Sequence, residues 1–402
     1  MSTTGFAREL DHTAGMRRCG TPEETLARVM PLRPTCGITR LARLTGLDDV
    51  GIPVFAAIRP HARSLVISLG KGGTDAAAKV SALMESVEIW HAERVRLPSR
   101  RGTAKFLSAR GHRVVAADLL PAAAGREVDP AARMDWVAGA DLQTGEPVWV
   151  PSDVVSLDFT SAGDSAASGL LRSSNGLASG NTRTEALVHA LCEVVERDAE
   201  ALWRRRADYA RVDPDTVTDP HCRELIAVLR AAGVGVLLWD VTSDIGVPAF
   251  GCLLTPASGD LRAVGLHDGF GCHLRPGVAL SRALTEAAQN RLTYISGSRD
   301  DLSREGLRQA VDPDRLARVS AELAAVPCTR DFADHKPPET ASLAADLDTV
   351  RARMTAAGFA DVVAVDLTYE ELGVPVVKVV VPGLEARFGD AEPGLRALAE
   401  SR

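Results

Sequence analysis

The spacing of apolar and polar residues divides most of the chain into alternating strand-like and helix-like segments. Short apolar runs that stop at turn residues indicate buried strands, whereas apolar positions that recur every three or four residues indicate helices. The predicted strands cover residues 63–69, 113–117, 154–157, 235–241, 248–254, 362–367 and 376–381. The predicted helices cover residues 74–93, 184–206, 276–295 and 343–357. This alternation favours an α/β or mixed α+β core.

Three polar stretches are predicted as turns or linkers, at residues 99–102, 162–180 and 329–339. The second stretch is rich in Ser and Gly and runs directly into the predicted helix at 184–206. Backbone N–H groups at a helix N-terminus can bind an anion. The stretch is therefore either an anion-binding loop or an ordinary surface loop.

Composition limits the class of protein. The 402 residues are 46% hydrophobic and 25% charged, which is typical of a globular chain with a sizeable core. The formal net charge of −7 does not favour sequence-independent nucleic-acid binding. With neither a secretory signal nor a long apolar span, we expect a cytoplasmic protein without membrane segments. The seven cysteines contain no CxxC pair, which favours reduced, small apolar residues over a zinc or redox site.

Three of the predicted helices carry polar side chains along one face. At about 100° per residue, the acidic residues of the helix at 184–206 fall on one stripe, opposite its apolar residues. The other two helices repeat this arrangement. The three faces consist of Glu185, His189, Glu193 and Glu196; of Ser81, Glu85 and Glu88; and of Arg282, Glu286, Gln289 and Asn290.

Each face can be a solvated helix surface, or it can line a binding site. A solvated face usually pairs Glu with Lys four residues away, and the stripe of Glu185, Glu193 and Glu196 has no such lysines. Clustered carboxylates bind hard cations such as Mg²⁺, which often bridges to nucleotide phosphates. The pattern therefore predicts a Mg²⁺–nucleotide site, although the P-loop-like segment at residues 70–74 lacks the Walker spacing.

Four motifs, taken in their order along the chain, resemble the YcaO family. They are SALMESVE (81–88), SNGLASGN (174–181), EALVHALCEVVERD (185–198) and EAAQNR (286–291). The resemblance covers about residues 17–385, with residues 1–16 as an N-terminal extension and residues 386–402 as a C-terminal tail. It implies a YcaO-type fold with an ATP site between amphipathic helices and mixed sheets.

The resemblance also implies roles for individual residues. The Mg²⁺-coordinating acids would be Glu85, Glu88, Glu193 and Glu196, and the catalytic positions would be Glu193, Glu196 and Arg197. The nucleotide contacts would be Arg18, Thr25, Ser81, Asn181, Glu185, Arg282, Glu286, Gln289 and Arg291. One departure from the family pattern is Ile89, which stands where many relatives carry Arg after the second acid of SxxxExxE.

The implied activity is ATP-dependent phosphorylation of a peptide backbone amide oxygen, which makes this oxygen a leaving group before a nucleophile attacks the carbon. The single-module length and plain C-terminus favour a stand-alone, TfuA-associated enzyme that forms a thioamide with an external sulfur source. Two alternatives stay open: azoline or macroamidine formation on a ribosomally made peptide, and a nucleotide-binding accessory protein. We expect a TfuA-like or leader-binding partner protein, whereas a homodimer, the substrate peptide and the sulfur donor stay open.

Overall fold

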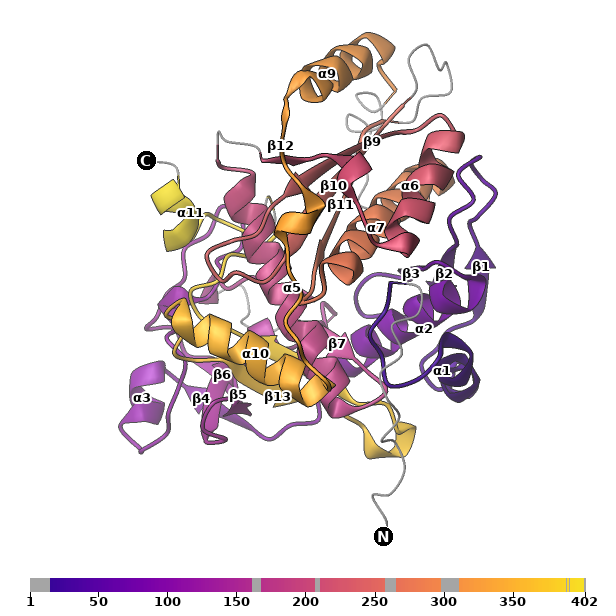
Figure 1. Cartoon of the computed structure of the whole chain (residues 1–402). Helices are drawn as coiled ribbons and strands as arrows, with labels where there is room; N and C mark the ends of the chain where they lie inside the picture. Colours follow the sequence, from indigo (N-terminus) through magenta and orange to yellow (C-terminus); the bar gives the residue numbers. More distant parts are fainter. Residues whose placement is uncertain are drawn as a thin grey trace.

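The computed structural model describes residues 15–160, 168–206, 210–256, 265–297, 311–387, 389 and 391–400. Within these residues the chain forms three sheets with helices packed between and around them (Figure 1). This arrangement confirms the expected mixed helix-and-sheet class.

The smallest sheet carries the first of the acidic helices. Its antiparallel strands are β1 (Arg40–Arg43), β2 (Val54–Ile58) and β3 (Ile67–Lys71), in that order. Helix α2 (Asp75–Ala92) packs on β2 and β3, and α1 (Pro22–Val29) packs against α2. The predicted strand at 63–69 is displaced toward the C-terminus, because the backbone N–H groups of Arg63 and Ser64 donate to the Glu93 side chain instead of to a strand.

The five-stranded sheet carries another of the helices with a polar face. Its order is β11 (His267–Cys272), β10 (Ala249–Thr255), β9 (Gly235–Asp240), β8 (Arg211–Val212) and β12 (Cys328–Arg330), and β8 and β12 pair in parallel. Helix α7 (Pro276–Ser296) packs on β10 and β11, and α6 (Pro220–Ala231) packs on α7 and β9. Helix α9 (Pro313–Ala325) precedes β12 in the chain.

The six-stranded sheet is antiparallel and supports the longest acidic stripe. Its order is β4 (Ser99–Gly102), β5 (Met134–Asp141), β13 (Val363–Asp366), β14 (Val376–Val380) and β7 (Leu177–Ser179), with β6 (Pro147–Pro151) paired to β5. Helix α5 (Arg183–Trp203) packs on β7 and β14 and also contacts β11. It therefore lies between the two larger sheets, at the centre of the molecule (Figure 1).

Several short elements connect these layers. Helix α10 (Leu343–Ala356) packs on α5, and α3 (Ala104–Ser108) and α11 (Leu395–Glu400) lie toward the periphery (Figure 1). The 3₁₀ helices are η1 (Met30–Leu32), η2 (Ala117–Leu119), η3 (Ser152–Val154), η4 (Pro214–Thr216), η5 (Phe332–Asp334) and η6 (Glu370–Leu372). No described helix has the length and hydropathy that a membrane span needs.

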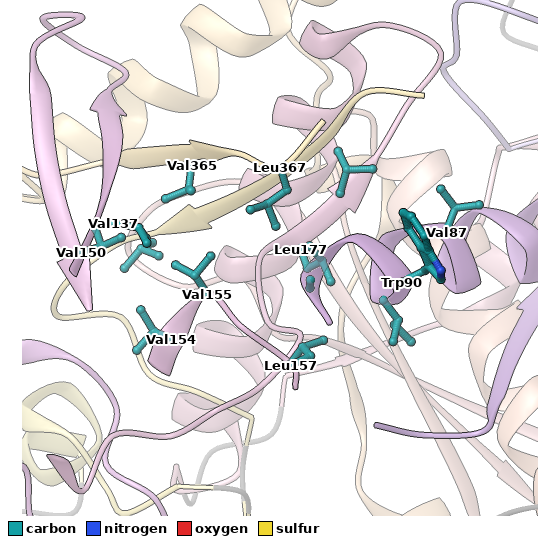
Figure 2. Close-up of a cluster of buried hydrophobic side chains, with 14 of the residues drawn as sticks. Val87, Trp90, Val137, Val150, Val154, Val155, Leu157, Leu177, Val365 and Leu367 are labelled. Carbon is teal, nitrogen blue, oxygen red and sulfur yellow. The ribbon is translucent and has the colours of Figure 1, made fainter. Parts of the chain in front are cut away.

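All four predicted helices are confirmed, as are the predicted strands at 235–241, 248–254, 362–367 and 376–381. The strand predicted at 154–157 is wrong, because this segment begins with the last residue of η3 and pairs with no described strand. Its side chains are apolar because Val154, Val155 and Leu157 pack in the same core cluster as Val137 and Val365 (Figure 2). Burial therefore explains this apolar run without strand pairing.

Three further expectations need correction. The segment 113–117 forms one bridge, between Val114 and Trp149, and no strand. The polar turn predicted at 99–102 is the edge strand β4, whose side chains are polar because they face solvent. The linker predicted at 329–339 includes part of β12 and η5. Within the Ser/Gly-rich stretch, residues 162–167 lie outside the described residues, and the stretch ends in β7.

Candidate active site

Three strand-to-helix junctions bring the polar faces together. Helices α2, α5 and α7 each follow directly on a strand, which is β3, β7 and β11 respectively. Thr74 and Thr182 cap the first two helices, and their hydroxyl oxygens accept 3.2 Å hydrogen bonds from the backbone N–H groups of Ala77 and Glu185. These caps fix where each helix begins and thus which residues its polar face presents.

Tight contact between β11 and α7 fixes the third helix. A Cβ on Gly271 would lie 2.1 Å from the carbonyl oxygen of Ala279 and 2.8 Å from the nitrogen of Ala283. Strand and helix therefore touch backbone to backbone, which is possible only for glycine at this position. Since Arg282 and Glu286 project from α7, this contact sets their distance from α5.

The N-terminal segment closes one end of the site around Glu185. This carboxylate is only 3% exposed and accepts hydrogen bonds from Cys19 N (2.9 Å), Arg18 Nη1 (3.1 Å) and Asn181 Nδ2 (3.2 Å). Thr25 donates its hydroxyl to Asn181 Oδ1 at 2.9 Å. The structure thus brings Arg18 and Thr25 of the N-terminal segment onto Asn181 and Glu185, which lie 156 or more positions further along the chain.

Acids from α2 and α5 converge on the SNGLASGN motif between them. Glu88 accepts hydrogen bonds from the backbone nitrogen (2.8 Å) and hydroxyl (2.6 Å) of Ser179, and Glu193 accepts one from Gly176 N (3.4 Å). Burial, and to a smaller extent the nearby charge of Glu193, raise the pKa of Glu88 to about 7, against the opposing effect of the hydrogen bonds from Ser179. Burial also raises the pKa of Glu193. Both carboxylates therefore lie where a counter-cation would be stabilising.

Ser81 and Glu85 lie on the same face of α2 as Glu88, about two turns and one turn nearer the N-terminus respectively, and both are half-buried. Gln289 is half-buried on α7, three residues beyond Glu286. These positions agree with the faces that the sequence predicts.

A second group of charges surrounds Arg197. Its Nη1 lies 3.5 Å from Glu196 Oε1, 3.5 Å from Glu200 Oε2 and 3.8 Å from Glu286 Oε1. Burial alone would lower the pKa of Arg197, but the surrounding carboxylates outweigh it and raise this pKa above its ordinary value. Among the described residues, none accepts a hydrogen bond from the buried Nη1 of Arg197.

Glu196 and Arg282 tie α5 to the five-stranded sheet. Glu196, 1% exposed, accepts a 2.9 Å hydrogen bond from Cys272 N at the end of β11. Arg282 lies 2.9 Å from His189 Nδ1 and 4.0 Å from Glu196 Oε2. Burial and the charge of Arg282 hold the pKa of His189 well below its usual range, so this imidazole is neutral.

The low exposure of Glu185 and Glu196 rules out a solvated surface as the explanation for the acidic face of α5.

One candidate residue, Arg291, faces away from the site. The guanidinium of Arg291 pairs with Asp48, in the loop after β1, at 3.0 Å. This ion pair directs Arg291 toward the loop after β1 and not toward the other candidate residues.

Sequence reasoning missed two lysines. Lys71, in the segment rejected as a P-loop, donates to Glu286; burial would raise the pKa of Glu286, but Lys71 and Arg197 lower it to about 2. Lys378 lies on β14 and is 3% exposed, and its Nζ donates to the carbonyl of Ser173 at 2.6 Å. Burial lowers the pKa of Lys378 to about 7, opposed by the charge of Glu193. A single Lys within the strand sequence VVKVVV was the available signal.

The donor set fits Mg²⁺ held jointly with phosphate. Within the part of the chain that the structure describes, no three Asp, Glu, His or Cys side chains enclose a metal ion by themselves. Mg²⁺ is usually bound by one or two carboxylates, with water and substrate phosphates completing its octahedral shell. The raised pKa values of Glu88 and Glu193 are consistent with carboxylates that need such a cation.

Clustered carboxylates bordered by Arg and Lys side chains are the chemistry expected of a Mg²⁺-dependent nucleotide-binding protein. A sequence model of the YcaO cyclodehydratase family, described as ATP- and Mg²⁺-binding, matches residues 69–385. The chain is 36% identical, over 391 residues, to an uncharacterized protein in the tfuA 3′ region of Rhizobium leguminosarum bv. trifolii. That match covers 95% of this chain and 92% of the relative.

Two solved structures are similar along most of the chain. YcaO from Methanopyrus kandleri, bound with AMPPCP and Mg²⁺, matches with a TM-score of 0.75 and 30% identity, over 94% of this chain and 95% of that one. A heterocyclase in complex with substrate and cofactor shares the fold, with a TM-score of 0.77 at 24% identity. The chain spans 56% of that longer protein. The chain therefore belongs to the YcaO family and is an ATP-dependent, peptide-modifying enzyme with ATP and Mg²⁺ as its cofactors.

Proposed function

We propose that the protein phosphorylates the oxygen of a backbone amide in a peptide, and that an external sulfur source then converts this amide into a thioamide. The observation that supports a thioamide as the product is the 36% identity to the protein of the tfuA 3′ region. This similarity extends over nearly the whole of both chains. We place the catalytic domain at residues 17–385, because Arg18 and Thr25 already contact the site residues Glu185 and Asn181.

In this proposal the acids of α2 and α5 hold Mg²⁺ and the surrounding polar residues bind the nucleotide. The metal-holding acids are Glu85, Glu88, Glu193 and Glu196, and the nucleotide-binding residues are Arg18, Thr25, Ser81, Asn181, Glu185, Arg282, Glu286 and Gln289. ATP supplies the phosphoryl group that turns the amide oxygen into a leaving group. Arg291 contributes indirectly, since its ion pair with Asp48 anchors the C-terminal half of α7.

Arg197 is the residue placed to stabilise charge during phosphoryl transfer. Glu196, Glu200 and Glu286 surround its guanidinium, so it stays protonated and has little freedom to move. A cation held in place before the reaction stabilises developing negative charge without reorganisation. We assign a catalytic role to Arg197 on this basis. We assign catalytic roles to Glu193 and Glu196 as well, because they are among the acids that would hold Mg²⁺ at the phosphoryl group.

The test is a reconstitution with the purified chain, Mg-ATP, a sulfide salt and the peptide encoded beside the gene, together with any TfuA-like protein encoded there. Mass spectrometry should show a peptide in which one oxygen is replaced by sulfur, and only when ATP is present. A peptide that has lost one water and gained no sulfur would instead indicate an azoline or amidine product. ATP binding with no peptide product under any condition would favour the nucleotide-binding accessory protein.

A further inference from the structure

A small cavity lies beside the candidate metal site, on the side of β14 that carries Lys378. Its volume is about 50 Å³, which holds one or two molecules of water size. Most of its wall is apolar and comes from the segments that flank β7 and β14 and from α5. Its lining includes Val154, Leu171, Ser173, Asn175, Val194 and Lys378. Val154 is among the side chains drawn in Figure 2.

Lys378 is the ionisable side chain in the wall of this cavity, and because burial lowers its pKa to about 7, a bound anion would favour its protonated form. Its side chain is buried, and among the described residues its Nζ has one hydrogen-bond acceptor, the carbonyl of Ser173. An ammonium group has three N–H donors, so two remain for a ligand. The carbonyl oxygen of the Asn175 side chain is also buried, and no described group donates to it. The cavity therefore offers positive charge and one acceptor within apolar walls.

These features select the ligand by size, charge and hydration. Phosphate and carboxylate are bulky and strongly hydrated, and the apolar walls would leave most of their oxygens without donors. A small monoanion with a polarisable atom and one donor hydrogen loses less hydration and can satisfy both Lys378 and Asn175. Hydrosulfide has this chemistry.

The cavity also adjoins the chemistry of the site. Lys378 pairs with Leu177 across β14 and β7, and Gly176, the residue before Leu177, donates to Glu193. Val194, which lines the cavity, follows Glu193 on α5. A ligand at Lys378 would therefore lie close to an acid that we assign to Mg²⁺.

We propose that this cavity binds hydrosulfide, the sulfur nucleophile of the thioamidation, through Lys378 and Asn175. This inference rests on the proposed function. Sulfur attacks the carbon of the O-phosphorylated amide, and a C–S bond forms. The C–O bond then breaks, and phosphate leaves with the bonding electron pair and takes the S–H proton. No oxidant or reductant is needed, because sulfur enters as sulfide and remains so in the thioamide.

The kinetic test compares variants in the reconstituted reaction at varied sulfide concentration. Lys378→Met keeps the length of the side chain but removes its charge, and we expect the KM for sulfide to rise about tenfold or more. The KM for the peptide should change by less than about twofold on the same scale. Lys378→Arg should recover part of the sulfide affinity, and Lys105→Met, at an exposed position on α3, should match the wild type. An unchanged sulfide KM in a folded Lys378→Met protein overturns the proposal.

A second variant covers the case in which Lys378→Met fails to fold. Asn175→Asp is nearly isosteric and adds negative charge to the cavity wall, so it should also raise the KM for sulfide. Wild-type sulfide affinity in this variant would contradict hydrosulfide binding at this position.

A binding experiment separates this inference from the proposed function. Bromide serves as a small, polarisable monoanion whose anomalous scattering locates it in crystals of the full chain. We expect bromide beside Lys378 in the wild type and its loss in Asn175→Asp. Bromide at Lys378 without any thioamide product would refute the proposed function but leave an anion site. Thioamide formation with no bromide at Lys378 would refute the site alone.

Discussion

Burial determines how the individual carboxylates of the site behave. Glu88 and Glu193 come from different helices, and both have pKa values raised by burial, with the charge of Glu193 adding to the effect at Glu88. Two nearby carboxylates destabilise each other unless a cation or a proton lies between them. The same arrangement that makes these residues costly in the metal-free protein therefore favours Mg²⁺ binding.

Replacing Glu193 tests this interpretation directly. We expect Glu193→Gln to lower Mg²⁺-dependent ATP turnover with peptide present by at least about 100-fold, because an amide is a weaker ligand than a carboxylate. The variant should fold, since it removes charge from a group whose ionisation is already unfavourable. ATP turnover and thermal unfolding would be measured beside Glu322→Gln, a change at an exposed residue of α9. Wild-type turnover in Glu193→Gln would show that the metal assignment is wrong.

We expect Glu88 to make Mg-ATP binding depend on pH. Its pKa is raised from the ordinary range of a glutamate to about 7, so the folded protein retains a proton that the unfolded chain releases at lower pH. Between those two pKa values, this group makes the metal-free protein less stable as pH rises. Mg²⁺ requires the ionised carboxylate, so Mg-ATP should raise the melting temperature more above pH 7 than below it. Thermal unfolding with and without Mg-ATP across this range measures the effect.

The matched variant for this pH dependence is Glu88→Gln, which cannot titrate. In this variant the gain in melting temperature on adding Mg-ATP should be small and should vary less with pH. The same pH dependence in both proteins would exclude Glu88 as its source.

At the scale of elements, close strand–helix contact positions the charges of α7. We expect Gly271→Ala to destabilise the protein by about 1–3 kcal/mol, because the new methyl group would overlap the backbone of α7. It should also weaken ATP binding, since Arg282 and Glu286 move with that helix. Chemical denaturation and ATP titration provide the measurements. Gly251→Ala on β10 is the control, because its Cβ would lie 3.1 Å from the edge of a Phe270 ring and not against backbone.

Sequence patterns predict these elements well where they bury a continuous apolar face. Helices α2, α5, α7 and α10 and strands β9, β10, β13 and β14 were all predicted from their apolar positions. The prediction of strands fails where a buried segment does not pair in a sheet, and where a paired strand is exposed. Residues 154–157 are apolar and buried but pair with no described strand, whereas β4 pairs with β5 through exposed, polar residues. An apolar run reports burial, and only the fold decides whether the backbone also joins a sheet.

At the scale of the whole molecule, the faces of the site were predictable but their partners were not. Helical periodicity places Glu185, Glu193 and Glu196 on one stripe of α5. It gives no indication that Arg18 folds back onto Glu185 or that Lys71 reaches Glu286, because these contacts join residues more than 160 positions apart. Such contacts depend on how three sheets assemble around α5, which local pattern does not encode.

We expect modification of the peptide to depend on a partner protein. Helices packed on each of the three sheets supply the candidate ATP site, and in the described part of the chain no segment forms a separate module for holding a peptide. We expect the isolated chain to bind Mg-ATP but to modify micromolar peptide slowly. A second protein that tethers the peptide should accelerate the reaction, because tethering raises the local peptide concentration to about millimolar without new catalytic contacts.

The measurement is the initial rate of peptide modification at several peptide concentrations, with and without the TfuA-like or leader-binding protein encoded nearby. The partner should lower the KM for the peptide, and millimolar peptide should restore much of the rate in its absence. A variant such as Glu193→Gln should remain inactive even with the partner, since tethering cannot replace a metal ligand. Full-rate modification of micromolar peptide by the chain alone would contradict the prediction and would place peptide recognition on this chain itself.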